Sequence, residues 1–268
     1  MGNIPEAVVK RLKTTVPKFK KILTSARERD VNESDTVTIV TDILEEVFGF
    51  DKYTEITREY AIKGTFCDLA VKSDEGIEYL LEVKAIGLSL KDSYTRQAVD
   101  YASREGVKWV VLTNGVDWEI HRVSLDKSKV QTKLLFSFNF IEMNYRQKDQ
   151  QELLFLLCKR GVQKELIDDY YKYRQSVNCY TIGALLLTDS VTKVVCKELR
   201  KLKPDIKVNS TEIGELIKSG VIKREILESE AGVEANKQVI KFLKKQERIK
   251  EKTKGASQKV ESASENEH

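Results

Sequence analysis

The stretch from Phe66 to Lys84 contains three polar residues whose types and spacing suit a metal-dependent site. Asp68 lies within one apolar run, and Glu82 and Lys84 lie at the end of a second run. The two runs flank the turn Ser73–Gly76, and this arrangement predicts a β-hairpin. Because side chains alternate along a strand, Glu82 and Lys84 share one face of the second strand.

The register of this hairpin decides whether Asp68 joins the other two residues. If Asp74–Gly76 form a three-residue loop, Ser73 pairs with Ile77 and Asp68 falls directly opposite Glu82. Their Cβ atoms would then be ~4.5–5.5 Å apart. A two-residue loop would instead turn Asp68 to the opposite face of the sheet.

Two carboxylates that face each other repel unless a cation lies between them. Hard oxygen ligands favour Mg²⁺ or Mn²⁺, and a lysine beside them can orient a water or stabilise charge on a phosphate. The pattern therefore predicts a metal-dependent hydrolase site. The alternative is a surface ion network in which Lys84 simply neutralises one of the two carboxylates, Asp68 or Glu82.

Composition limits the other classes of site. The 268-residue chain has a net charge of +4, which tolerates a polyanionic partner without requiring one. It has no apolar run of about 18 residues, so we expect no membrane span. The scattered cysteines and the lack of a signal peptide predict a cytoplasmic protein. A structural zinc site is not expected, because no C-x-x-C pair occurs and no histidine lies near a cysteine, the residues being Cys67, Cys158, Cys179, Cys196, His121 and His268.

Two helices are expected before the hairpin. Residues 5–30 predict a basic amphipathic helix that Pro17 kinks or divides, and its basic face is either solvated or in contact with DNA. Asn32–Asp35 is a helix start signal and Gly49 a stop signal. Glu33 lies at the start of this second helix. It either reaches toward Asp68 and Glu82 or only favours the positive end of the helix dipole.

The remaining elements predict an α/β fold with a mixed sheet. A helix separates the Glu82 strand from the apolar run Val107–Leu112, so these two strands should be parallel. Gln97 and Tyr101, four residues apart, lie on one side of that helix. The elements expected around the hairpin are a strand at Tyr53–Ala61, a helix at Leu90–Glu105, and strands at Val107–Leu112, Trp118–Val123 and Leu134–Phe140.

Four regions are predicted along the chain. They are a basic N-terminal helix (1–30), an α/β domain (31–145), a helical region (150–246) and a disordered tail (247–268). The helical region is either a separate domain or a cap on the first one.

Several of these residues together resemble a known superfamily. Asp68 followed by Glu82-Val83-Lys84 resembles the D…(D/E)-x-K core of the PD-(D/E)XK nucleases, and Gln97 to Tyr101 is similar to the Q-x-x-x-Y motif of one of its branches. The segments around Asn32–Asp51 and Leu112–Trp118 resemble the N-terminal nuclease domain of type I restriction enzyme R subunits.

This resemblance implies a restriction-endonuclease-like mixed sheet flanked by helices, followed by a smaller all-helical region. It implies an Mg²⁺-dependent (or Mn²⁺-dependent) endonuclease that hydrolyses DNA phosphodiester bonds in restriction or defence. The roles that it implies are metal binding by Asp68, Glu82 and the Val83 carbonyl, orientation of the attacking water by Lys84, assistance by Glu33 as an outer acid, and support of the site by Gln97 and Tyr101.

The chain also departs from the family pattern. Cys67 precedes Asp68 where the family has proline, and no G-x-x-x-x-G-K-[ST] loop occurs, so we expect neither ATP binding nor an ATPase motor. Because double-strand cleavage with one site per chain calls for two copies, we expect a homo-oligomer. The alternative is a nucleic-acid-binding or assembly module that keeps the fold without cutting, and the choice between DNA and RNA stays open.

Overall fold

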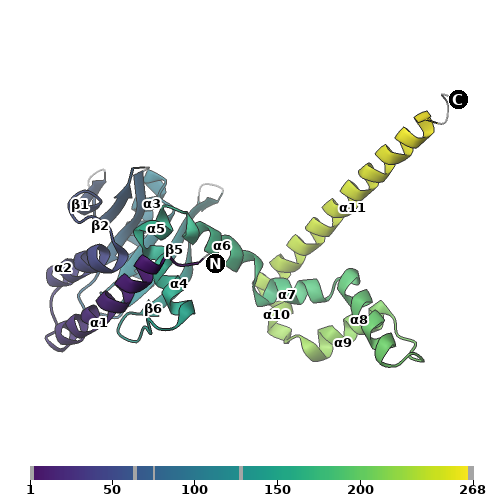
Figure 1. Ribbon diagram of the computed structural model, residues 1–268, viewed down its shortest axis with the longest axis horizontal. Helices are drawn as coiled ribbons and strands as arrows, with labels where there is room; N and C mark the ends of the chain where they lie inside the picture. The colour runs from purple at the N-terminus through teal and green to yellow at the C-terminus, as the bar shows by residue number, and fades with distance from the viewer. Residues whose placement is uncertain (1–2, 63–64, 75, 127–128, 265–268) are drawn as a thin grey trace. The chain divides into compact units, whose positions relative to one another are not determined.

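Over the residues that the structure describes, a mixed sheet of six strands runs in the order β1-β2-β3-β4-β5-β6 (Figure 1). The computed structural model describes residues 3–62, 65–74, 76–126 and 129–264. Neighbouring strands are antiparallel except β3 and β4, which are parallel, and this confirms the predicted mixed α/β sheet. The strands are β1 (Ile56–Ile62), β2 (Thr65–Ser73), β3 (Gly76–Val83), β4 (Trp109–Thr113), β5 (Asp117–Asp126) and β6 (Lys129–Asn139).

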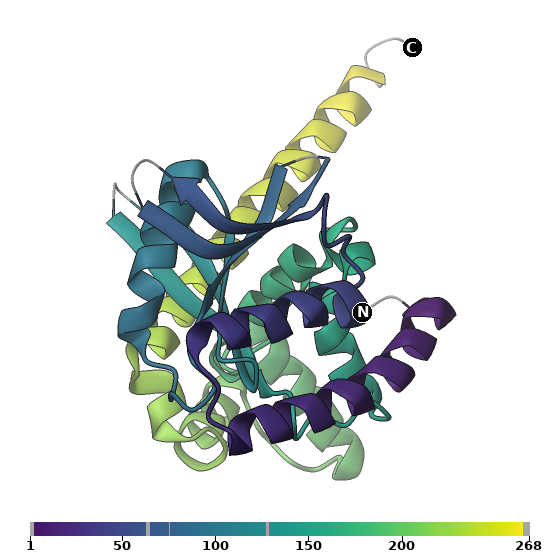
Figure 2. The same ribbon diagram turned by 90° about the vertical axis from the view of Figure 1, so that its left-hand side faces the viewer.

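Helices cover both faces of this sheet. On one face, α1 (Glu6–Glu28), α2 (Glu33–Ile43), the π-helical turn η1 (Leu44–Phe48) and α4 (Lys148–Leu157) enclose the larger apolar core. Figures 1 and 2 show α1 and α2 side by side. On the other face, α3 (Asp92–Glu105) packs on a smaller core. The helix α3 also joins β3 to β4, as the parallel pairing requires.

The first helix forms because its apolar residues recur every three or four positions. The buried set is Val8, Leu12, Val16, Phe19, Leu23 and Ala26. Pro17 lies inside one continuous helix, so the predicted division at this residue is wrong. Proline is tolerated here although it removes one backbone donor, because the buried side chains on both sides of it hold the helix against the core.

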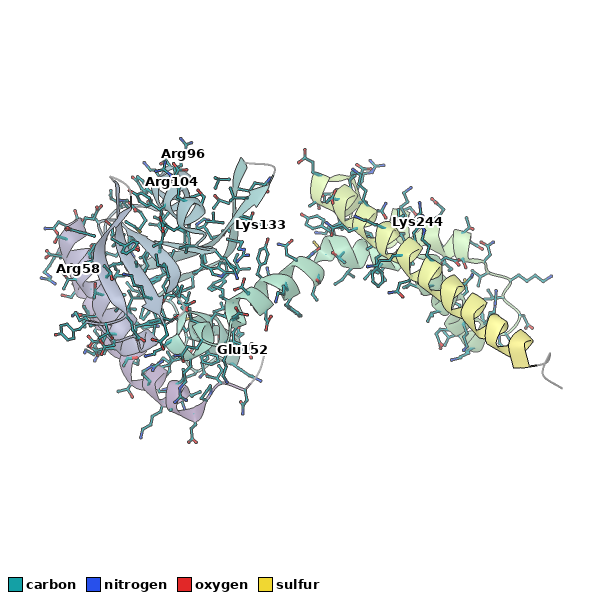
Figure 3. All side chains as sticks on the ribbon, turned by 90° about the horizontal axis from the view of Figure 1, so that it is seen from above. Arg58, Arg96, Arg104, Lys133, Glu152 and Lys244 are labelled. Atoms are coloured by element: carbon teal, nitrogen blue, oxygen red, sulfur yellow. The ribbon has the colours of Figure 1, made fainter. Side chains whose placement is uncertain are left out.

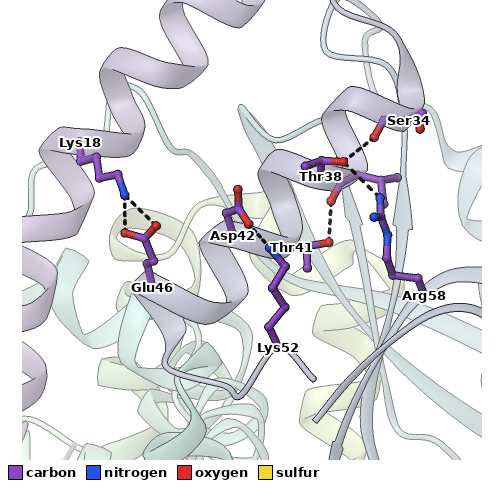
Figure 4. A network of polar contacts seen from close by, with 9 residues as sticks. Lys18, Ser34, Thr38, Thr41, Asp42, Glu46, Lys52 and Arg58 are labelled. Carbon is purple, nitrogen blue, oxygen red and sulfur yellow. Dashed lines mark hydrogen bonds and ion pairs between the residues drawn. The ribbon is translucent and has the colours of Figure 1, made fainter. Parts of the chain in front are cut away.

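Two basic residues of α1 bind the chain itself. Arg11 donates to the carbonyl oxygens of Val47 and Phe48 at 3.0 and 3.2 Å, where the helix ends at Gly49. Lys18 forms an ion pair with Glu46 (Figure 4). These two contacts favour a structural role over a DNA contact for this part of the basic face.

The helix α2 is held at its start and along its outer face. The Asn32 side chain accepts a hydrogen bond from the Asp35 N–H, which is the helix cap that the sequence predicts. Figure 4 shows Arg58 of β1 donating to the Thr38 hydroxyl at 3.2 Å, and Lys52 paired with Asp42. These contacts attach α2 to the edge of the sheet.

The first strand begins later than predicted. Its expected start was Tyr53, but β1 begins at Ile56. Asp51 explains the difference, because its carboxylate accepts hydrogen bonds from the N–H groups of Tyr53 and Thr54 at 3.0 and 2.8 Å. An aspartate that binds the following N–H groups favours a turn over an extended strand.

The chain divides into two units by its internal contacts, Met1–Tyr171 and Lys172–His268. The first unit therefore extends beyond residue 145, to include α4, α5 (Lys159–Val162) and the first part of α6 (Leu166–Ser176). Asp168 of α6 pairs with Arg122 of β5 at 2.9 Å. This contact with the sheet explains why the first part of α6 belongs to the first unit.

The second unit is helical. The predicted helix Ile182–Leu199 is interrupted at Thr188, and helix α11 runs to Ser264, through most of the segment predicted to be disordered. The elements are α7 (Cys179–Leu186), α8 (Asp189–Leu202), α9 (Ser210–Leu216), the π-helical turn η2 (Ile217–Val221), α10 (Arg224–Glu228) and α11 (Glu230–Ser264).

Among the described residues, no single helix has both the length and the apolar composition of a membrane span. The helices α7 and α8 meet those limits only when they are taken together, as a pair bent by 65°.

The burial of the cysteines leads to a test of the fold. Cys67, Cys158 and Cys196 are buried, and Cys179 is exposed. Burial raises the pKa of Cys67 to about 12 and that of Cys158 to about 11, so these thiols do not form the reactive thiolate at neutral pH. We expect a thiol reagent to label the native chain at one site, counted by mass spectrometry. The variant Cys179→Ser should then show almost no labelling, and rapid modification of Cys67 would contradict the fold.

Candidate active site

The β2–β3 hairpin brings Asp68 and Glu82 opposite each other by a route that differs from the prediction. Ser73 pairs with Gly76 instead of Ile77, so the loop is one residue shorter than expected. A β-bulge between Val71 and Lys72 then shifts the register by one residue. Beyond the bulge Leu69 pairs with Leu81, and the same register continued by one residue places Asp68 opposite Glu82. The bulge therefore cancels the effect of the shorter loop.

Four side chains meet at the end of β3, and we call them the carboxylate–lysine cluster: Glu33, Asp68, Glu82 and Lys84. The Lys84 Nζ atom lies 2.8 Å from Glu82 Oε1 and 3.6 Å from Glu33 Oε2. Asp68 Oδ2 accepts a hydrogen bond from the N–H of Val83 at 2.7 Å. Glu33 thus reaches from the start of α2 to the sheet, as one of its two interpretations predicted.

The cluster lies at a partly solvent-exposed position. The Glu82 side chain is only 7% exposed and Lys84 16%, whereas Glu33 is 46% exposed. A buried carboxylate is costly unless a partner compensates its charge. Glu82 has such a partner in Lys84, but one ammonium group faces three carboxylates.

The pKa values reflect this excess of negative charge. Burial raises the pKa of Asp68 above its usual range, although the Val83 N–H and Lys84 act in the opposite direction. Burial also raises the pKa of Glu82, and the nearby Asp68 adds to the increase. Burial alone would lower the pKa of Lys84, but Glu82, Glu33 and Asp68 raise it above its usual range. The lysine therefore stays charged at neutral pH.

The helix α3 contributes a tyrosine that the sequence analysis missed. The Lys84 Nζ atom lies 5.7 Å from the centre of the Tyr94 ring, within the range of a cation–π contact. Tyr94 is seven residues before Tyr101 and so lies on the same side of the helix, which is the signal that was available. Tyr101 itself is 2% exposed and packs in the smaller core. The Gln97 side chain lies outside the described residues.

Two further residues surround Asp68. The buried thiol of Cys67 donates to the Leu81 carbonyl oxygen at 3.0 Å, so the residue that replaces proline links β2 to β3. Glu59 of β1 has a φ of 47°, which is unusual for a non-glycine residue, and its charge also raises the pKa of Asp68. The sequence analysis assigned neither residue a role in the site.

The donor set is compatible with one divalent cation. Asp68 and Glu82 offer hard carboxylate oxygens, the type that Mg²⁺ and Mn²⁺ prefer. The cluster has three carboxylates and one ammonium group, and so carries two negative charges in excess when all are ionised. Within the part of the chain that the structure describes, no three His, Cys, Asp or Glu side chains are placed to hold one metal ion. The predicted ligand set has only two such side chains, Asp68 and Glu82, beside the Val83 carbonyl, and it stays a prediction.

Comparison with known proteins finds a family match over the part of the chain that holds most of the cluster. Residues 40–135 match the family model described as type I restriction enzyme R protein N terminus. The matched segment includes Asp68, Glu82, Lys84 and Tyr94 but begins after Glu33. No curated protein and no solved structure was found to match. The resemblance to this nuclease domain is thus shown over residues 40–135.

The charge imbalance predicts a stability effect that does not depend on catalysis. Because the pKa of Asp68 is raised on folding, the folded state holds more protons just above the ordinary pKa of 3.8. Protonated Asp68 therefore stabilises the folded state at low pH, and this contribution to the free energy of unfolding is lost as the pH rises through the raised pKa of Asp68. We expect Asp68→Asn, which keeps an acceptor for Val83, to raise the Tm at pH 7 in EDTA by roughly 2 °C. Calorimetry measures this change.

Added Mg²⁺ should reverse the order of the two proteins. It should raise the Tm of the native chain, because a bound cation stabilises the folded state, and should have little effect on Asp68→Asn. The control is Asp42→Asn, which removes a carboxylate of α2 that pairs with Lys52 instead of the cluster. A fall in the Tm of Asp68→Asn in EDTA would contradict the charge imbalance.

Proposed function

We propose that the first unit is a metal-dependent endonuclease that hydrolyses phosphodiester bonds in DNA. The observation that carries the proposal is the meeting of Asp68, Glu82 and Lys84 at the end of β3. These three residues lie in the segment that matches the N terminus of type I restriction enzyme R proteins. The family match suggests the class of reaction, and the cluster contains the chemical groups that this reaction needs.

Asp68, Glu82 and the carbonyl of Val83 would hold an Mg²⁺ or Mn²⁺ ion. The ion supplies Lewis-acid activation of the phosphate and lowers the pKa of a bound water. The Val83 N–H orients Asp68 for this role, because it binds one of the two carboxylate oxygens. Glu82 is similarly held by Lys84 through Oε1.

We propose that Lys84 orients the attacking water and stabilises the negative charge that develops on the phosphate. Its raised pKa keeps the ammonium group protonated, so it can donate hydrogen bonds to oxygens that become more negative in the transition state. Glu33 and Tyr94 restrict where the ammonium group lies, since one pairs with it and the other faces it. We propose that both residues position Lys84.

The test is cleavage of supercoiled plasmid and linear duplex DNA with Mg²⁺ or Mn²⁺, without ATP. We expect the native chain to cut, and Asp68→Ala and Lys84→Ala to lose roughly 100-fold or more in rate. Asp42→Asn serves as the matched control, because its carboxylate pairs with Lys52 outside the cluster, and it should cut normally.

The other outcomes separate the alternatives. Binding of DNA without metal-dependent cutting would favour the non-cutting binding or assembly module. Cutting that survives both Asp68→Ala and Lys84→Ala would show that the cluster is not the active site. A parallel reaction with RNA of the same sequence identifies the substrate, and an unchanged rate on addition of ATP would agree with the missing ATP-binding loop. Light scattering tests the expected homo-oligomer.

A further inference from the structure

The positive charge of this protein is concentrated in the second unit. Residues 172–268 contain 20 lysines and arginines and 14 aspartates and glutamates, a net charge of +6 against +4 for the whole chain. Residues 237–254 contain eight of the basic residues and two of the acidic ones, which accounts for the excess of the whole unit. This segment lies within helix α11.

The basic side chains described in this segment share one face of α11. Lys237, Lys241, Lys244 and Arg248 follow the spacing i, i+4, i+7, i+11, which places them in one row along a helix. Lys244 is labelled on α11 in Figure 3. A shallow groove on this face is lined by Lys237, Ile240, Lys241, Lys244, Lys245 and Arg248. We call this face the basic stripe.

The opposite face of α11 is committed to the fold of the second unit. Ala235 and Val239, two residues either side of Lys237, are 8% and 7% exposed, and α11 packs on α7 and α10. Gly232 allows a close approach at the start of the helix, since a Cβ atom there would collide with the carbonyl oxygen of Ile226. Because Ala235 and Val239 are buried on the opposite face, the basic stripe faces away from the core of the second unit.

The charges of the basic stripe are not neutralised within the described part of the chain. All five cations of the stripe are exposed, and no ion pair between described residues involves any of them. Lysines on α8 of the same unit differ in this respect, since Lys193 pairs with Asp189 and Lys201 with Glu198, both at 2.6–2.7 Å. A row of exposed cations attracts a polyanion.

We propose that the basic stripe of α11 binds the phosphate backbone of nucleic acid. The inference deepens the proposed function, since it rests on DNA as the substrate and assigns the second unit the role of holding it. A row of cations about 16 Å long, from Lys237 to Arg248, faces several phosphates of one strand. Such contacts give affinity without reading sequence.

The DNA substrate proposed for the first unit favours nucleic acid over a lipid surface as the partner of the basic stripe. A helix that lies on a membrane inserts an apolar face beside its basic one. Ala235 and Val239 of α11 are buried within the unit, whereas Ile240 and Phe242 are 44% and 57% exposed. Vesicles that contain anionic lipid are therefore an arm of the test.

The experiment measures binding of a fluorescent DNA duplex to the full chain in EDTA, where metal-dependent cutting does not occur. Fluorescence anisotropy over a series of salt concentrations gives the affinity and its salt dependence. We expect the double variant Lys241→Gln, Lys244→Gln to bind on the order of 10-fold more weakly, with a slope of log K against log salt reduced by about 2. The matched control, Lys193→Gln with Lys201→Gln, removes two lysines that are already paired and should bind almost as the native chain does.

The outcomes separate this inference from the proposed function. Equal losses in the two double variants would overturn the inference, because they would reflect net charge alone, and so would unchanged binding by the stripe variant. Stronger binding of the native chain to anionic vesicles than to DNA would also overturn it. Loss of binding in the stripe variant alone would support it even if the native chain fails to cut DNA, whereas cutting with no role for the stripe would leave only the nuclease.

Discussion

The buried carboxylate of Glu82 beside the partly buried carboxylate of Asp68, on the neighbouring strand, is the constraint on which the candidate site depends. Asp68 and Glu82 face each other across β2 and β3, and burial raises the pKa of both. An ordinary domain avoids this arrangement, because opposed carboxylates destabilise a sheet. Lys84 offsets part of the repulsion and leaves an excess that suits a divalent cation. Under the proposed function, the lower stability is the cost of a charge pattern that suits phosphodiester hydrolysis.

The surrounding structure keeps this arrangement in place. The Val83 N–H fixes one oxygen of Asp68, and the Cys67 thiol links β2 to β3 next to it. The helix α2 brings Glu33 to Lys84 from one side, and α3 brings Tyr94 from another. Because these contacts come from elements on both faces of the sheet, the packing of the whole first unit sets the geometry of a few side chains.

The two units contribute different physical properties. The first unit carries a net charge of −2 and holds the carboxylate–lysine cluster, whereas the second carries +6 with an exposed basic stripe. A negatively charged site binds metal well but repels the phosphate backbone. In the proposed function, the positive charge of the second unit offsets that repulsion, so that the two units divide cleavage and binding of DNA between them. This division of roles would explain why a helical region follows the nuclease-like unit.

The sequence determined the main elements around the site and the polar residues Glu33, Asp68, Glu82 and Lys84 as candidates. Alternation in the β3 run placed Glu82 and Lys84 on one face, the start signal at Asn32 set the beginning of α2, and the apolar run of β4 indicated a parallel central strand. These features are local, since they depend on residues within a few positions of each other. The extent of the first unit to Tyr171 was not predictable in this way, because the Arg122–Asp168 pair joins residues far apart in sequence.

Only the tertiary structure decided the register and the choice of aromatic residue. The loop after Ser73 is shorter than expected, and a bulge beside Val71, which the sequence does not announce, restores the pairing of Asp68 with Glu82. Tyr101 and Tyr94 lie on the same side of α3, but Tyr101 is enclosed by the core and Tyr94 faces Lys84. The helical period predicts the side of the helix on which a side chain lies. It does not predict the residues that the side chain contacts, because these depend on where the helix packs against the sheet.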